Sequence, residues 1–256
     1  MQGSGQRVHG SRRFADRETL TAIGRTVNLV TRLHFFCELE AAHFERSGKT
    51  MTTHLRRIIS ALRRHGLLLK QDRALPNVVG LVTGEVLSGS WWSHPRAQEI
   101  FAVLHELVER AEVLETKLIG GKVTFVHERL WPAWLAVATS GESWQQAGLS
   151  AAARQLLTEV RRAGEREGSG AAVKELERRL LVRSEQRHTE SGRHVLVLES
   201  WPRWAKRCDV HALPTAEGKT ALELAASSLG APIRALPWRA ERPLATRRRR
   251  LGRSAP

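Results

Sequence analysis

Two indoles and an imidazole occur together in the run Trp91-Trp92-Ser93-His94-Pro95, the most unusual stretch of this sequence. Stacked indoles can hold an unpaired base, and backbone N–H groups at the start of a helix can bind phosphate. Adjacent aromatic residues are also common in protein cores, where one ring is buried and its neighbour partly covers it. We favour this packing interpretation, with Ser93 as the cap of the following helix.

A second histidine opens the run His127-Glu128-Arg129, whose side chains could serve acid–base chemistry if His127 met His94 in space. A histidine at the end of a strand is more often a structural residue, so we expect no catalytic residue here. The sequence has no common catalytic or nucleotide-binding motif, and Cys37 and Cys208 lack metal-ligand spacing, so we expect neither a cofactor nor a metal. The candidate pocket of the enzyme alternative comprises Trp91, Trp92, His94 and His127.

Lysine and arginine side chains gather on a helix and a hairpin predicted between Ala171 and His194. Such cations could follow the phosphates of a nucleic acid. Acids are interleaved with them at Glu175, Glu177 and Glu185, a pattern typical of a solvated face held by ion pairs. We favour nucleic-acid binding over this alternative, because the order of the elements and the overall charge agree. The candidate binding residues are Lys174, Arg178, Arg179, Arg183, Arg187 and Arg193.

The whole chain is strongly basic, with a formal net charge of +15 over 256 residues. Between Arg239 and Pro256 there are seven arginines against Glu241 alone, a net +6, which leaves +9 of the +15 for the rest. A charge this far from zero favours a polyanionic partner. A high arginine content can also reflect a GC-rich genome, so composition alone leaves both explanations open.

The elements that must position these cations lie between Leu149 and Glu199. Apolar residues recur at helical spacing from Leu149 to Val160, with Ser150 as the expected N-cap. Val173, Leu176 and Leu180 fall on one face of a second helix. Two extended runs follow, LLVRSEQRHT and RHVLVLES, separated by the turn residues Glu190-Ser191-Gly192.

Helix, helix and β-hairpin in this order resemble the C-terminal half of a winged-helix DNA-binding domain, over residues 149–199. The AVKELERRLLV run resembles a recognition helix that leads into the first wing strand. The resemblance implies duplex DNA as the partner, with the helix around Lys174 presenting the residues able to read bases. A full winged helix has another helix before the recognition helix, and residues 164–170 are too few to form it.

The stretch from Leu75 to Trp204, with its GSWWSHP and KVTFVHERLWP runs, also resembles a set of uncharacterised bacterial proteins. This resemblance implies one folded unit from roughly Thr52 to Trp238 and no particular activity.

The rest of the chain predicts several short elements. We expect a helix from a cap at Thr52 or Thr53 to His65, after a break at Ser47-Gly48-Lys49, then a strand at LLLKQD. We also expect a loop with a short strand or turn at Ala74–Gly84, and a helix capped by Ser93 with Pro95 in its first turn. Further expectations are a two-residue type I′ hairpin at Gly120-Gly121, a helix from Leu130, an irregular basic stretch after Trp204, and a helix capped by Thr215.

These patterns predict an α+β protein, mainly helical with small antiparallel hairpins and a winged-helix-like C-terminal part. We expect a cytoplasmic protein, because no secretory signal and no run of eighteen uncharged apolar residues occurs, so no membrane is involved. The expected parts are an N-terminal extension at 1–50, partly disordered; an α+β domain at 52–145; a winged-helix-like unit at 146–205; a C-terminal helix region at 206–238; and a basic disordered tail at 239–256.

The function that we expect is non-catalytic binding of nucleic acid, duplex DNA in particular. Two alternatives remain open at this point. One is a nucleic-acid-processing enzyme with a pocket near Trp91, Trp92 and His94, and the other is an α+β interaction module whose basic surface is incidental. The salt dependence of binding separates the first two functions from the third.

Overall fold

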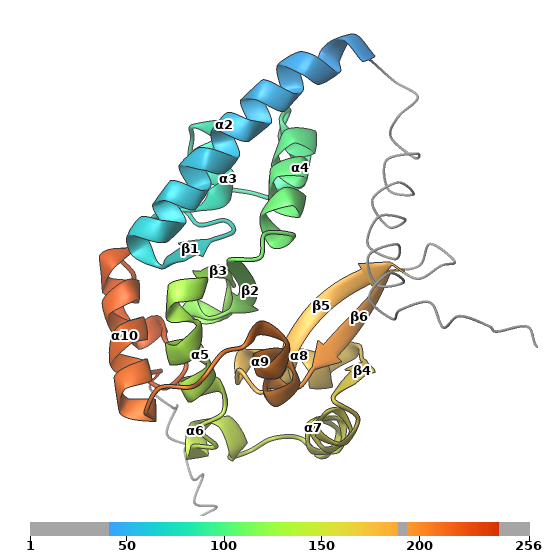
Figure 1. Ribbon diagram of the computed structural model, residues 1–256, viewed down its shortest axis with the longest axis vertical. Helices are drawn as coiled ribbons and strands as arrows, with labels where there is room; N and C mark the ends of the chain where they lie inside the picture. The colour runs from blue at the N-terminus through green and yellow to red at the C-terminus, as the bar shows by residue number, and fades with distance from the viewer. Residues whose placement is uncertain (1–40, 189–193, 241–256) are drawn as a thin grey trace, which may run out of the picture. The chain divides into compact units, whose positions relative to one another are not determined.

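The computed structural model describes residues 41–188 and 194–240 (Figure 1). The chain divides into two compact units between Thr50 and Met51. All the strands of the described residues belong to the second unit. The predictions for residues 1–40, for the turn at 190–192 and for the tail beyond Ala240 lie outside the described residues.

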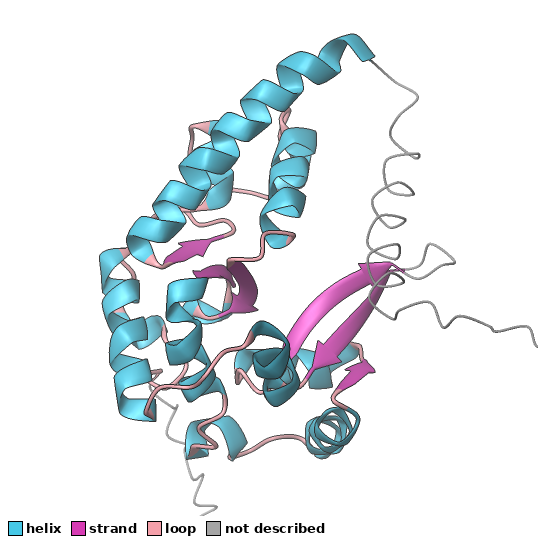
Figure 2. Cartoon of the chain, in the orientation of Figure 1, coloured by secondary structure: helices cyan, strands magenta, loops and turns pink. Residues whose placement is uncertain are grey.

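The fold is α+β, as predicted: helices predominate, and the described strands form two three-stranded antiparallel sheets (Figure 2). None of the helices within the described ranges is both long enough and apolar enough to cross a membrane. Helix α2, Ala41–His65, runs through the predicted break at 47–49, so neither Thr52 nor Thr53 is a cap. A single glycine costs a helix only about 1 kcal/mol, and no proline interrupts this segment.

The first sheet has the strand order β1-β3-β2, built from β1 Leu67–Leu69, β2 Val113–Lys117 and β3 Val123–His127. The central strand β3 is buried on both faces, since Thr124, Phe125 and Val126 are at most 1% exposed. Gly66 turns the chain from α2 into β1 with a φ of 78°, and a Cβ there would lie 2.6 Å from Leu130 Cδ1. Only glycine fits this turn without strain.

The hairpin between β2 and β3 forms as predicted, but its loop is longer. The last cross-strand pair is Lys117 with Val123, so the loop covers residues 118–122 and contains the 3₁₀ turn η2, Ile119–Gly121. Gly120 and Gly121 both have the expected positive φ. The loop is longer because Leu118 and Ile119 turn into the core, where they are 0% and 3% exposed.

Helix α3, Val78–Thr83, occupies the segment for which the sequence predicts a loop and a short strand or turn. Asn77 caps it, with Oδ1 accepting a hydrogen bond of 2.8 Å from the Gly80 N–H. After the 3₁₀ turn η1, Trp91–Ser93, helix α4 covers Ala97–Val108. The predicted cap Ser93 is therefore wrong: Ser90 caps η1, and α4 begins after Pro95.

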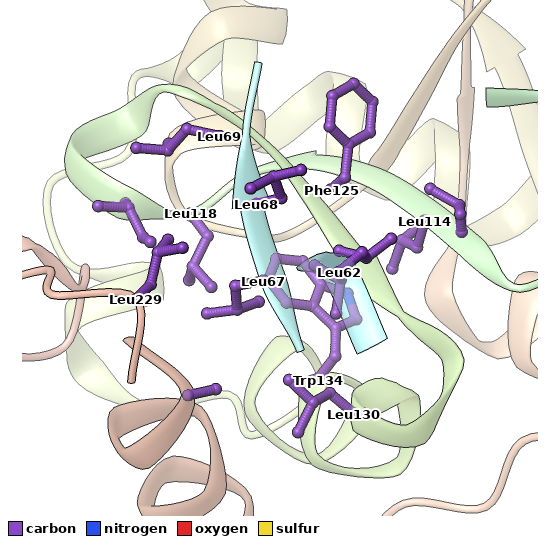
Figure 3. Close-up of a cluster of buried hydrophobic side chains, with 14 of the residues drawn as sticks. Leu62, Leu67, Leu68, Leu69, Leu114, Leu118, Phe125, Leu130, Trp134 and Leu229 are labelled. Carbon is purple, nitrogen blue, oxygen red and sulfur yellow. The ribbon is translucent and has the colours of Figure 1, made fainter. Parts of the chain in front are cut away.

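The larger hydrophobic core joins the first sheet to α2, α5 Trp131–Ala138 and α10 Thr215–Ser228. Its largest fully buried side chain is Trp134, and Figure 3 shows leucines from α2, β1 and the hairpin gathered around it. Helix α10 packs closely on α5 at Gly218, where a Cβ would lie 2.8 Å from the Ala133 carbonyl oxygen. Short turns complete this part: η3 Glu128–Leu130, α6 Ser143–Gln146 and η4 Ile233–Ala235.

Helix α9, Trp201–Cys208, replaces the irregular basic stretch that the sequence predicts after Trp204. Its two tryptophans make edge-to-face contacts with the core: Trp201 with Trp134 at 5.5 Å between centroids, and Trp204 with Trp131 at 5.2 Å. Trp201, Trp204 and Ala205 are buried on one face of α9 at helical spacing, and burial of the two large rings holds the helix on the core.

The second sheet and its helices make a smaller core of their own. The order along the chain is α7 Ala151–Ala163, β4 Glu165–Glu167, α8 Gly170–Arg178, β5 Arg183–His188 and β6 His194–Glu199, with strands paired β4-β6-β5. The predicted helices and hairpin are present, and Ser150 caps α7 by accepting from the Ala153 N–H at 3.1 Å. Strand β4 is not predicted, and only Gly168 and Ser169 separate it from α8.

Candidate nucleic-acid interface

The hairpin arginines are held by carboxylates of the same sheet. Arg183 Nη1 lies 3.1 Å from Glu185 and 3.2 Å from Glu199, which is only 2% exposed. Arg187 pairs with Glu185 at 3.1 Å and with Glu165 of β4 at 3.4 Å. The hairpin arginines therefore form ion pairs with the acids interleaved among them, as the alternative to nucleic-acid binding predicts.

Helix α9 extends this network with two further arginines. Arg203 lies 3.0 Å from Glu165, and Arg207 lies 2.7 Å from Glu199. Burial of Glu185 works to raise the pKa of its carboxyl, but Arg183 and Arg187 outweigh burial and keep that pKa below its ordinary value. A phosphate that bound this face would have to displace the protein's own carboxylates.

Arg179, which follows α8, ties the end of that helix to α6 and to Ala147 after it. Its Nη1 donates to the carbonyl oxygens of Trp144 at 3.0 Å and Ala147 at 2.8 Å. In return, Gln145 Nε2 donates to the Arg179 carbonyl oxygen at 3.3 Å. These contacts leave its guanidinium little freedom to reach a ligand.

Lys174 and Arg178 differ from the other candidates in that both are exposed on α8. The Arg178 Nε donates to the Lys174 carbonyl oxygen at 3.2 Å. This acceptor is uncharged, so the hydrogen bond leaves the positive charge of the guanidinium unneutralised. No carboxylate of the described residues lies within ion-pair distance of either side chain. Arg193 lies outside the described residues. Of the predicted set, only these two therefore offer an uncompensated charge in the described part of the chain.

The acids of α8 are turned toward the protein. Glu177 is 8% exposed, pairs with Lys117 and accepts from the Ser184 hydroxyl. Glu175 accepts from the Ser150 hydroxyl at 2.8 Å and from its backbone N–H at 3.2 Å. The hydrogen bonds from Ser150 hold the pKa of Glu175 below its ordinary value. Both acids thus serve contacts within the fold.

A second basic surface, to which the sequence analysis assigns no site, lies on α2. The apolar residues Leu55, Ile58, Ile59 and Leu62 are buried as predicted. The exposed side carries a surface groove of about 610 Å³. The lining residues are Thr53, Arg56, Arg57, Ser60, Ala61 and Arg64 of α2 and Leu81 of α3. The available signal was the lack of any acid between Met51 and His65.

The tryptophan pair has the geometry that the packing interpretation predicts. Trp91 is 6% exposed, and Trp92, which is 63% exposed, stacks on it with ring centroids 3.9 Å apart. The outer indole also lies 5.8 Å from the ring of Phe101 on α4. One ring therefore belongs to the core, and the other covers it.

His94 and His127 have separate sets of neighbours. His94 Nε2 lies 2.8 Å from Glu85, and its Nδ1 accepts from the Arg96 N–H. His127 Nδ1 accepts from the Arg129 N–H at 3.3 Å, its Nε2 has no hydrogen-bond partner among the described residues, and burial lowers the pKa of the ring. Among the described residues no hydrogen bond or ion pair joins the two rings, and no cluster of metal-ligating side chains is found.

Comparison of the chain with protein families, curated proteins and solved structures found no match. The winged-helix resemblance therefore remains a hypothesis.

Proposed function

We propose that this protein binds nucleic acid, duplex DNA in particular, through phosphate contacts and without catalysis, and that α8 provides one contact surface. The observation that carries the proposal is the exposed pair Lys174 and Arg178. The two positions are one helical turn apart, so both side chains extend from the same face of α8. The opposite face packs Val173 and Leu176 into the smaller core.

The order of elements around α8 supports the same proposal. A helix that precedes a β-hairpin can enter the major groove while the hairpin lies along the backbone. Here the hairpin arginines pair with Glu165, Glu185 and Glu199, so the charge for phosphate contacts comes from the helix. The proposal therefore assigns Arg183 and Arg187 to the stability of the sheet and not to DNA contacts.

The test is the salt dependence of duplex DNA binding by the full chain, measured by fluorescence anisotropy. Each lost phosphate contact lowers the slope of log K against log [salt] by about one unit in magnitude. The double variant Lys174→Ala/Arg178→Ala should therefore flatten the slope by up to about two units. Thermal unfolding should show an unchanged midpoint, because both side chains are exposed.

A matched control removes two positive charges that are already paired. Lys219 pairs with Glu142 at 2.6 Å and Arg239 with Glu223 at 2.8 Å. We expect Lys219→Ala/Arg239→Ala to leave the slope near that of the wild type. Equal flattening by both double variants would remove α8 as a specific surface. A wild-type protein with no salt-dependent binding at low ionic strength would favour the interaction-module alternative.

A further inference from the structure

We propose that the groove on α2 is a second phosphate-binding surface, which holds the sugar–phosphate backbone of a nucleic acid. The inference rests on the proposed function for its ligand class but concerns a different surface, on the larger core. The groove is lined by arginines of α2 and closed on one side by Leu81 of α3.

Two of the groove arginines, Arg57 and Arg64, have no ion-pair partner among the described residues. No carboxylate of the described residues lies within ion-pair distance of Arg57 or Arg64, and the α2 sequence has no acid from Met51 onward. Arg183 and Arg207 differ in this respect, because both form ion pairs with the buried Glu199. An external anion is therefore the partner that these two guanidinium groups lack. Arginine is well suited to this role because its planar fork binds phosphate through two donors.

The shape of the groove favours a chain of phosphates over a single one. Arg57 and Arg64 are seven residues apart, which places their backbones about 10 Å apart along the helix axis. A nucleic-acid strand carries one phosphate for each nucleotide, so the length between the two arginines accommodates more than one phosphate. Between the arginines lie the small side chains of Ser60 and Ala61, which allow a backbone to approach α2 closely.

The side chains of Arg57 and Arg64 are not needed to hold α2 in place. Leu55, Ile58, Ile59 and Leu62 anchor the helix in the core. The contact from Arg129 Nη2 reaches the carbonyl oxygen of Arg64, not its side chain, and survives substitution by alanine. A loss of binding in arginine variants can therefore be separated from a loss of folding.

The experiment compares Arg57→Ala/Arg64→Ala with Lys174→Ala/Arg178→Ala in the full chain, each titrated with fluorescent duplex DNA over a range of salt. Both remove two positive charges. We expect Arg57→Ala/Arg64→Ala to flatten the salt slope by up to about two units. Ala61→Glu, which places a carboxylate on the floor of the groove, should weaken binding as well, whereas Arg57→Lys/Arg64→Lys should retain most of the slope. Thermal unfolding checks that each variant is folded.

The outcomes separate this inference from the proposed function. A wild-type slope in Arg57→Ala/Arg64→Ala, together with a reduced slope in Lys174→Ala/Arg178→Ala, overturns the inference and leaves the α8 proposal intact. The reverse result supports the groove and removes α8. No salt-dependent DNA binding by the wild type overturns both.

Two further probes test the ligand class. Vesicles of phosphatidylserine and phosphatidylcholine test for a membrane surface, and inorganic phosphate tests for a single-anion site. Vesicle binding that depends on Arg57 and Arg64, with DNA binding unaffected, would overturn the nucleic-acid assignment. Displacement of DNA by inorganic phosphate at equal ionic strength would overturn the argument from groove length, whereas no displacement supports it.

Discussion

Two regions of this molecule are both rich in arginine, but the surroundings of those arginines are opposite. In the second sheet and α9, the arginines contact carboxylates, one of which is only 2% exposed. On the groove side of α2, the sequence from Met51 to His65 supplies arginines and no acid. The paired set is Arg183, Arg187, Arg203 and Arg207 with Glu165, Glu185 and Glu199.

The difference teaches that the number of arginines does not identify a binding surface. A buried carboxylate needs cations around it, because an uncompensated charge in the interior is costly. Arginines that serve this need are fixed and neutralised. Those without such partners keep their counterions, which a polyanion can release on binding. The contrast is therefore between cations that stabilise the fold and cations available to a ligand.

The largest expected effect on stability is at two neighbouring tryptophans, of which Trp91 is buried and Trp92 is exposed. Trp91→Ala should lower the free energy of unfolding by about 3–5 kcal/mol, in the range for large buried rings. Trp92→Ala should cost less than about 1 kcal/mol, since its indole is mostly exposed. Urea unfolding measures both values, and binding of single-stranded DNA by Trp92→Ala measures whether the outer ring stacks on bases. Equal, large losses of stability would show that both rings are core.

Glu199→Gln should have the next largest effect, because it removes the buried carboxylate at the centre of the ion-pair network. We expect a loss of about 3 kcal/mol, the low end for a broken buried pair, since Arg203 and Arg207 are 49% and 51% exposed. Glu159→Gln is the control: its partner Arg166 is 50% exposed, so the change should cost less than about 1 kcal/mol. Similar costs in urea unfolding would show that the network does not stabilise the sheet.

Acid should weaken the paired region through Glu185. Burial works to raise its pKa, but Arg183 and Arg187 hold that pKa below the ordinary 4.5. The folded state therefore binds this proton less readily than the unfolded state. Stability from Glu185 is present above about pH 4.5 and is lost as the pH falls toward the folded pKa. The midpoint of thermal unfolding should fall less steeply on acidification in Glu185→Gln than in the wild type. Identical slopes would contradict this assignment.

The smallest effect on stability is expected on α2. Arg57→Ala and Arg64→Ala should each change the free energy of unfolding by no more than about 0.5 kcal/mol, because neither side chain has an ion-pair partner among the described residues. Urea unfolding of the single variants checks this value. A loss comparable with that of Glu199→Gln would mean that these arginines support the fold.

The sequence predicts elements that carry their own local signal. Ser150, the apolar positions of α7, and the positive φ of Gly120 and Gly121 are each fixed by nearby residues. Helix α3 is missed because its VVGLVT run has strand propensity, which the Asn77 cap and burial override. Strand β4 is missed because the short polar run ERE shows no alternation of apolar residues.

The candidate site is predicted less well than the fold, because its properties depend on distant partners. Arg187 pairs with Glu165, 22 positions earlier, and Arg203 comes from a helix that the sequence does not predict. The groove on α2 needs Leu81, which belongs to the missed helix α3. Sequence therefore locates the cations but cannot tell which of them are neutralised.

The most direct test of this account compares two charge-matched double variants, Arg57→Ala/Arg64→Ala and Arg203→Ala/Arg207→Ala, in salt titrations of duplex DNA binding. Each removes two arginines, from the uncompensated and from the paired region respectively. The account predicts that the first flattens the slope of log K against log [salt] by about two units at unchanged stability. The second should lower stability and leave the slope as in the wild type. Equal flattening by the two variants would contradict the account, because net charge alone would then govern binding.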